Sequence, residues 1–235
     1  MSSLNILGGG AAQGLVASLA PAFKVRTGFE ITGEFGAVGA MADKLRQSTA
    51  ADIVILTAAI VAALAEEKLV VASSIMDIGL VETALAVRAG DPLVTARDAA
   101  GLRECLLASD AIFVPDTKAA TAGIHLAKVV AQIGIADEVA ARLRIFPNGA
   151  TAMREMAASD ARRPIGCTQS TEIISTKGVV LSGALPPGCE LATMYTVGAT
   201  TKAAHAPQAQ ELIGLLIGAG QREQRERAGF MSSSK

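Results

Sequence analysis

The chain has 235 residues, of which 51% are hydrophobic and 3% aromatic, and its formal net charge is −1. This length allows one large or two small domains with an aliphatic core. Basic and acidic residues nearly balance and form no basic stripe, which argues against nucleic acid as the main partner. The three cysteines are widely spaced, which indicates reduced core thiols rather than disulfides or a zinc site. The two histidines are too few for a histidine-rich metal site, so we expect no metal and no cofactor.

The N-terminal sequence does not follow the signal-peptide pattern. No Lys or Arg precedes the first apolar run, which soon reaches glycines. No stretch of about 20 apolar residues is present to span a membrane. We therefore expect a cytoplasmic protein without membrane insertion, or a periplasmic one if a leader has been removed.

Short apolar runs alternate with longer amphipathic runs in the first third of the chain. Uninterrupted aliphatic strands between helices indicate a mostly parallel sheet covered on both faces, and hence an α/β fold. The predicted strands are 4–7, 29–35 and 52–56, and the predicted helices are a first one through Phe23, then 38–48 and 58–68.

The rest of the chain repeats this alternation and contains two unusually long predicted strands, near 80–88 and 190–198. Each could run from one sheet into another, which predicts a discontinuous first domain (1–80 plus 195–235) around an inserted domain (83–190). The other predicted elements are strands 111–115, 143–146 and 164–167, a short strand after 178, and helices 98–107, 120–133, 149–157 and 207–219.

Five predicted strand-to-helix junctions consist of small or hydroxyl residues. In a doubly wound sheet such junctions share the carboxyl edge of the strands, where ligands bind. Small residues there expose backbone N–H groups at helix N-termini, which favour anions. Any one junction is explained by a tight turn, but five together indicate an anion pocket. The junctions are 7–14, 36–41, 55–59, 117–123 and 166–172.

The glycines of the first junction do not carry a nucleotide-binding motif. Gln13 breaks the G-x-G-x-x-G spacing that starts at Gly8, and no Gly-Lys-Ser/Thr triplet follows. We therefore expect the first junction to bind an anion other than a nucleotide phosphate.

Three segments resemble the molybdate-binding-protein-like branch of the type II periplasmic solute-binding proteins. Phe23 to Ile31 resembles the family's F-x-x-x-T-G-x-x-V segment, Gly36 to Gly39 its G-S-S-G turn, and Ala51-Asp52-Ile53 its A-D-V strand opening. The resemblance extends over essentially the whole chain. It implies a type II periplasmic-binding-protein fold of two lobes that close on a ligand, with two crossover strands as the hinge.

The departures from this family change the expected ligand. Molybdate binders use a serine in each of the first two turns, where this chain reads GGGAAQ and GAVG. The segment that carries the family's later tyrosine ligand reads GCTQST here. The resemblance therefore implies a small organic acid, dicarboxylic or tricarboxylic, in the interlobe cleft rather than molybdate. An ABC transporter permease is the implied partner of an exported protein.

Aconitate isomerase also resembles this branch, which leaves binder and enzyme as open alternatives. The enzyme would be a cofactor-free isomerase of a small unsaturated carboxylic acid, working by proton transfer. Glu172 and His125 are the candidate catalytic groups, although each has an ordinary structural role as an alternative. Thr57 is the best single ligand candidate, with helix capping as its alternative. The candidate ligand-binding residues are Gly9, Gly10, Ala11, Gln13, Ala37, Val38, Thr57, Ala120, Thr121, Gln169 and Ser170.

Overall fold

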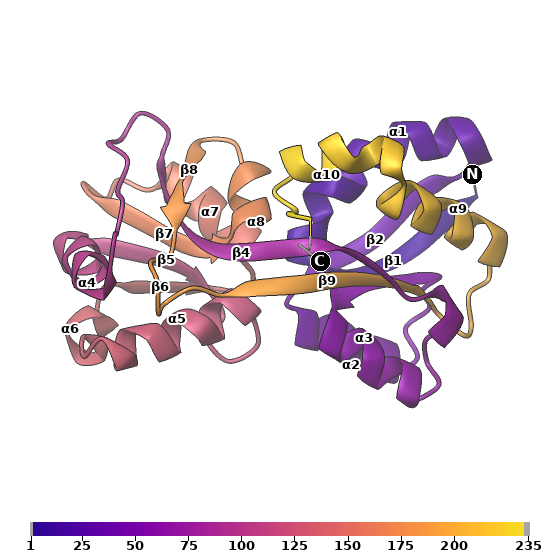
Figure 1. The fold of residues 1–235 in the computed structure, drawn as a ribbon, viewed down its shortest axis with the longest axis horizontal. Coiled ribbons are helices and arrows are strands. Elements are labelled where there is room, and N and C mark those ends of the chain that lie inside the picture. The colour runs from indigo at the N-terminus through magenta and orange to yellow at the C-terminus, as the bar shows by residue number, and fades with distance from the viewer. Residues whose placement is uncertain (1, 233–235) are drawn as a thin grey trace. The chain divides into compact units, whose positions relative to one another are not determined.

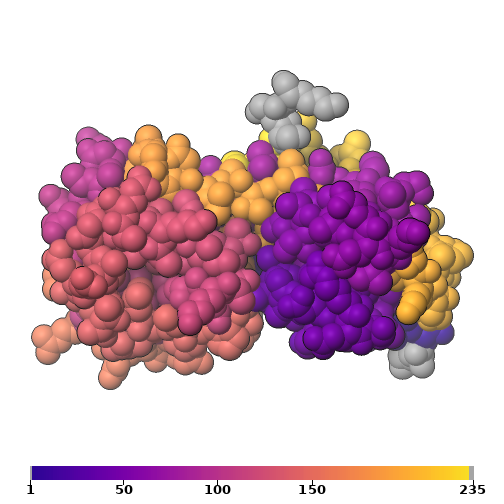
Figure 2. Space-filling model, turned by 90° about the horizontal axis from the view of Figure 1, so that it is seen from below, coloured from indigo at the N-terminus to yellow at the C-terminus, as the bar shows by residue number. Residues whose placement is uncertain are grey.

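The computed structural model describes residues 2–232, and the chain divides into two compact units. Unit 1 consists of Met1–Val81 and Thr193–Lys235, and unit 2 is the segment Glu82–Ala192 between them. In the space-filling view, the indigo and purple residues of unit 1 and the pink and orange residues of unit 2 each gather into a body of their own (Figure 2). Each unit has a hydrophobic core of its own.

Unit 1 is built on a sheet whose strands follow the order β2-β1-β3-β9. Strands β1, β2 and β3 are parallel, whereas β9 pairs antiparallel with β3. The strands are β1 (Ser3–Gly9), β2 (Glu30–Gly36), β3 (Ile53–Thr57) and β9 (Ala192–Ala199), and β4 (Met76–Arg88) starts in this unit. The helices are η1 (Gly10–Ala12), α1 (Gln13–Thr27), α2 (Val38–Arg46), α3 (Ala58–Glu66), η2 (Ala72–Ser74), α9 (Ala206–Ile217), η3 (Ala219–Gln221) and α10 (Arg222–Arg227).

Helices cover both faces of the unit 1 sheet. The α1 and α9 helices pack together on one face, and α2 and α3 lie on the other (Figure 1). Strand β3 is buried along its whole length, which explains its uninterrupted aliphatic sequence. The buried Asp52 carboxylate, just before β3, accepts hydrogen bonds from the N–H groups of Asn5 and His205, both at 2.9 Å. Asp52 thus ties the sheet to the start of α9.

Unit 2 contains a second mixed sheet, in which β8 pairs with β4 and the strands continue in the order β4-β7-β5-β6. Strands β5, β6 and β7 are parallel, and β4 is antiparallel to both β7 and β8. The strands besides β4 are β5 (Ala111–Pro115), β6 (Leu143–Phe146), β7 (Pro164–Gln169) and β8 (Val179–Ala184). The helices are α4 (Ala99–Ala108), α5 (Thr121–Gln132), α6 (Ala136–Ala140), α7 (Gly149–Ala158) and α8 (Ser170–Ile174).

Alternate residues of β5 face two separate cores in unit 2. Ile112 and Val114 pack with the apolar side chains of α4, α5 and α6, whereas Ala111 and Phe113 pack with α7 and α8. Because successive side chains of a strand point to opposite faces, this pattern places helices on both faces of the sheet. The two-sided burial explains why β5 reads as a continuous apolar run.

The predicted α/β fold of two sheets, each flanked by helices, is confirmed. The expected strands 111–115 and 143–146 agree with β5 and β6, and most other expected boundaries shift by a few residues. The expected strand 164–167 extends further, because Thr168 and Gln169 pair with β4. None of the helices formed by residues 2–232 is long and apolar enough to cross a membrane.

Candidate functional site

Three helix starts of unit 1 lie along one edge of its sheet. Strand β1 ends at Gly9, which pairs with Gly36 at the end of β2, and the neighbouring Gly8 pairs with Ile55 of β3. The following helices η1, α2 and α3 begin at Gly10, Val38 and Ala58. The first three predicted junctions are therefore brought together, as expected for parallel strands.

These three helix starts lack side-chain caps. The residues before them, Gly9, Ala37 and Thr57, have extended backbone conformations, and none makes a side-chain hydrogen bond to its helix. By contrast, Asp98 caps α4 and Asn148 caps α7, each accepting from a backbone N–H at 2.8 Å. Since the first N–H groups of a helix have no partner within the helix, the unit 1 edge presents several backbone donors.

The structure assigns different surroundings to the other unit 1 candidates. Thr57 is 9% exposed and does not cap α3, so the capping alternative for this residue is wrong. Gly10 and Ala11 are buried within η1, whereas Gln13 is exposed at the start of α1. Gly10, Ala11 and Gln13 are thus close in the chain but differ in their exposure to solvent.

Tyr195 of β9 lies beside this edge of the sheet and is buried in the core of unit 1. It pairs with Thr57 across the β3–β9 ladder. A Cβ atom added at Gly9 would lie 2.9 Å from Tyr195 Cε1 and 2.8 Å from Val38 Cγ1. Glycine is therefore required at position 9 because the tyrosine ring packs against its backbone, which places the ring at the same edge as the backbone donors.

In unit 2, the strongest candidate is Gln169, the last residue of β7. Its side chain is 3% exposed, and neither its amide oxygen nor its amide nitrogen has a hydrogen-bond partner. Ser170, which follows it, is buried in the first turn of α8. Ala120 precedes α5 without a side-chain cap, and Thr121 begins that helix.

Two further threonines of unit 2 share this property with Gln169. Thr83 Oγ1 and Thr171 Oγ1 are also buried without a hydrogen-bond partner. Thr83 is the direct cross-strand partner of Gln169 in the β4–β7 ladder, and Thr171 lies two residues further along the chain. Neither threonine is among the candidates from the sequence, because Thr83 follows Glu82 in a strand of mixed polar and apolar residues and has no distinct local pattern. We call Thr83, Gln169 and Thr171 the unpaired cluster.

The side chain of the candidate acid Glu172 is buried inside unit 2, where its polar contacts are to residues of the same unit. Its carboxyl group accepts a hydrogen bond from the Thr168 hydroxyl at 2.5 Å and lies against Gly149, the first residue of α7. Burial raises the pKa of Glu172, and the Thr168 hydroxyl and the nearby backbone oppose the shift. The carboxyl group thus occupies the N-terminus of α7.

The other catalytic candidate, His125 of α5, is also engaged. Its Nε2 atom lies 2.8 Å from the carbonyl oxygen of Cys189, to which the ring donates. This contact joins α5 to the loop that leads into β9. Glu172 and His125 therefore both make structural hydrogen bonds, which was the alternative to a catalytic role for each of them.

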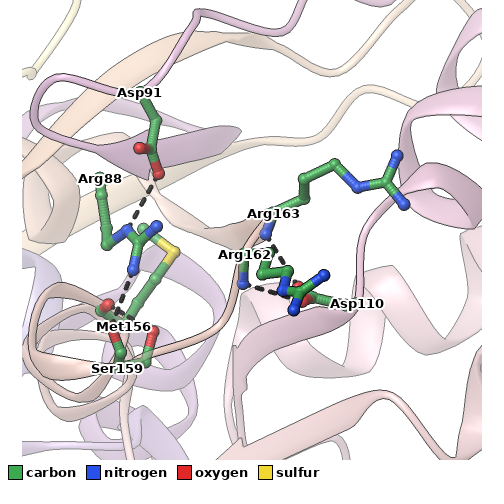
Figure 3. A network of polar contacts seen from close by, with 7 residues as sticks. All are labelled: Arg88, Asp91, Asp110, Met156, Ser159, Arg162 and Arg163. Carbon is green, nitrogen blue, oxygen red and sulfur yellow. Dashed lines mark hydrogen bonds and ion pairs between the residues drawn. The ribbon is translucent and has the colours of Figure 1, made fainter.

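The start of β7, at the other end of the strand from Gln169, borders a cavity of about 400 Å³ with mainly apolar walls. In the polar network beside it, Arg88 binds Asp91 and the carbonyl oxygen of Ser159, and Asp110 accepts from the N–H groups of Arg162 and Arg163 (Figure 3). All four contacts are internal to unit 2, and no atom of the unpaired cluster lines the cavity. We therefore do not assign the ligand site to it.

Within residues 2–232, no group of three or more His, Cys, Asp or Glu side chains is placed to hold a metal ion. The chemistry of the candidate site is instead that of backbone donors, hydroxyls and one carboxamide. Such a site suits a small polar molecule, and the uncapped helix starts favour a negative one.

The sequence profile of the bacterial extracellular solute-binding proteins matches residues 4–231, and the chain belongs to this family. An aconitate isomerase from a Pseudomonas species is 22% identical over 227 residues, which cover 92% of this chain and 82% of that protein. The family description is extracellular, so the expectation of a cytoplasmic protein gains no support from it.

Solved structures show the same fold at low sequence identity. The periplasmic molybdate-binding protein of Azotobacter vinelandii aligns with a TM-score of 0.82 at 16% identity, over 98% of this chain and 100% of that one. The sulfate-binding protein SubI of Mycobacterium tuberculosis aligns with a TM-score of 0.76 at 17% identity, over 100% and 88% of the two chains. The predicted type II periplasmic-binding-protein fold is thereby confirmed.

Proposed function

We propose that this protein binds a small organic acid, a dicarboxylate or tricarboxylate, rather than molybdate. The ligand would contact the uncapped helix starts of unit 1 and the polar side chains at the end of β7 in unit 2. The observation that carries the proposal is the alignment of three helix starts without side-chain caps along one sheet edge. As a solute-binding protein, the chain would deliver this ligand to the permease of an ABC transporter.

Backbone donors suit a negatively charged ligand for two reasons. The first N–H groups of each helix lack partners within the helix, and the helix dipoles add partial positive charge there. A hydrogen bond to a charged group contributes about 1.5–3 kcal/mol. Several such donors explain how a chain with a formal net charge of −1 binds an anion without a cluster of basic side chains.

The side chains present favour a carboxylic acid over a compact metal oxyanion. The residues at the starts of η1 and α2, Gly9 and Ala37, carry no hydroxyl group. The carboxamide of Gln169 offers both donors and an acceptor, which suits an organic acid with several polar groups. The related aconitate isomerase, whose name specifies a tricarboxylate, supports the same choice.

The proposal is tested by removing one backbone donor. Ala58 is the first residue of α3, where proline fits the helical backbone but has no N–H group. We expect Ala58→Pro to weaken binding of the best-bound acid by about tenfold to a hundredfold, the equivalent of one charge-assisted hydrogen bond. The ligand is first chosen by calorimetry from a panel of dicarboxylates, tricarboxylates, sulfate and molybdate.

The matched control is Ala99→Pro, the same change at the first residue of α4, whose start is capped by Asp98. This variant should bind as tightly as the unmodified protein. Equal affinities for all three proteins would contradict the use of the α3 start. Preference for molybdate over every organic acid would contradict the proposed ligand class.

A second candidate function is isomerisation of a small unsaturated carboxylic acid, favoured by the relative that covers 92% of the chain. Its test is turnover, followed by NMR after the protein is mixed with cis-aconitate or trans-aconitate. Interconversion that is lost on Glu172→Gln would support the enzyme. Saturable binding without turnover would leave the binding function alone.

A further inference from the structure

We infer that the ligand carries a hydroxyl group beside a carboxylate, and that the unpaired cluster selects it. This inference rests on the proposed function and specifies its ligand class. The cluster consists of Thr83 and Gln169, which face each other across β4 and β7, and of Thr171 in α8. The starting observation is that these side chains are buried with their polar atoms unpaired.

The cluster is exceptional within the part of the chain that the structure describes. The buried side-chain atoms without a partner there are Thr83 Oγ1, Gln169 Oε1, Gln169 Nε2 and Thr171 Oγ1. Their residues are 1%, 3% and 2% exposed, respectively. Because burial of an unpaired polar group is costly, four such atoms on a cross-strand pair and the helix turn that follows it indicate a recognition site rather than chance.

Two of the three side chains are placed next to each other by the sheet, and the third follows two residues later in the chain. Directly opposed residues of an antiparallel pair have their Cβ atoms about 4.5–5.5 Å apart on the same face. Thr83 and Gln169 are such a pair, and the chain turns into α8 immediately after Gln169.

A carboxamide makes demands that a bare anion does not meet. The Gln169 nitrogen donates and needs an acceptor, whereas its oxygen accepts and needs a donor. A fully ionised carboxylate or an oxyanion offers acceptors only, and it would repel the amide oxygen. A hydroxycarboxylate meets both needs, since its carboxylate accepts from Nε2 and its hydroxyl donates to Oε1. The threonine hydroxyls can donate to the remaining carboxylate oxygens or accept from the ligand hydroxyl.

The test uses pairs of acids that differ by one hydroxyl at equal charge: citrate against propane-1,2,3-tricarboxylate, and malate against succinate. Isothermal titration calorimetry should show the hydroxylated member of at least one pair binding about tenfold or more tightly. In Gln169→Met, which keeps the length of the side chain and removes its polar atoms, the preference should fall below about threefold. Gln210→Met, at an exposed position of α9, should retain the full preference.

A second measurement does not depend on the ligand. Because Gln169→Met removes an unpaired buried amide, the ligand-free variant should melt at a higher temperature than the unmodified protein. A lower melting temperature would show that the amide is paired, and the inference would fail. Equal binding of both members of each pair would also overturn it while leaving the proposed function intact. Binding of no acid at all would overturn both.

Discussion

Replacement of Gly149 most directly tests the buried position of the Glu172 carboxyl group. It is the first residue of α7, and an added Cβ atom would lie 2.0 Å from both Glu172 Oε2 and Thr168 Oγ1. A third atom, Glu172 Cδ, would lie 2.6 Å away. The change Gly149→Ala therefore cannot be accommodated unless the carboxyl group leaves its position.

The expected cost has two parts. Overpacking of a buried site costs about 1–3 kcal/mol, and a displaced carboxyl leaves at least one buried donor unpaired at about 1–3 kcal/mol. We expect Gly149→Ala to lower the free energy of unfolding by about 2–6 kcal/mol. Since small proteins have about 5–15 kcal/mol in total, this variant should lose much of its stability.

The measurement is equilibrium unfolding in urea, with Gly214→Ala as the matched control. Gly214 lies exposed in α9 with no atom within 4 Å of an added Cβ, so the same substitution there should stabilise the protein by about 0.5–1 kcal/mol. Adding Glu172→Ala to Gly149→Ala should cost less than the sum of the single changes, because the two sites are in contact. If the free energy of unfolding of Gly149→Ala is within about 0.5 kcal/mol of that of the unmodified protein, the described position of the Glu172 carboxyl group is wrong.

Three other predictions concern buried polar groups and thiols. Asp52→Ala should lower the free energy of unfolding by about 1–3 kcal/mol, because two partly buried backbone N–H groups lose the buried carboxylate that accepts from them; urea unfolding that shows no change would contradict this role. Because burial raises the pKa of Glu172, its protonated form stabilises the fold fully below the ordinary value of 4.5, and this contribution is lost as the pH rises toward the folded-state pKa. The stability of the unmodified protein relative to Glu172→Gln should therefore decrease as the pH rises above 4.5, and an increase would refute the sign. Burial raises the pKa of Cys167 to about 12, whereas Cys105 is partly exposed, so mass spectrometry after thiol labelling of the native protein should find Cys105 modified first.

The fold could be predicted from the sequence because its strands are buried on both faces. Continuous aliphatic runs such as 111–115 mark each strand, and small residues mark the turns that follow. The long strand β4 was also visible, although its start at Met76 was missed. Its first two residues, Met76 and Asp77, are exposed, and Gly79 interrupts the run, so no continuous apolar pattern marks the start of the strand.

The candidate site could be predicted only in part. Thr57 was found because it closes an apolar strand, and Gln169 because it lies in a strand-to-helix junction. The structure shows that Thr57 leaves its helix uncapped. The sequence alone cannot decide whether this hydroxyl caps the helix or is available to a ligand. The contact between Glu172 and Gly149 joins residues far apart in the chain, and Thr83 acquires its meaning only through pairing with Gln169. Both contacts depend on how distant segments pack or pair in the fold, so no local sequence pattern marks them.

The division of unit 1 into two chain segments has a consequence for synthesis. A growing chain contains all of unit 2 before Thr193 emerges, whereas β9, the partner of β3, comes later. The inserted unit can therefore acquire its native structure during translation while the edge of β3 is still open. A chain released after residue 192 should therefore contain a protease-resistant segment 82–192 and a protease-sensitive N-terminal part.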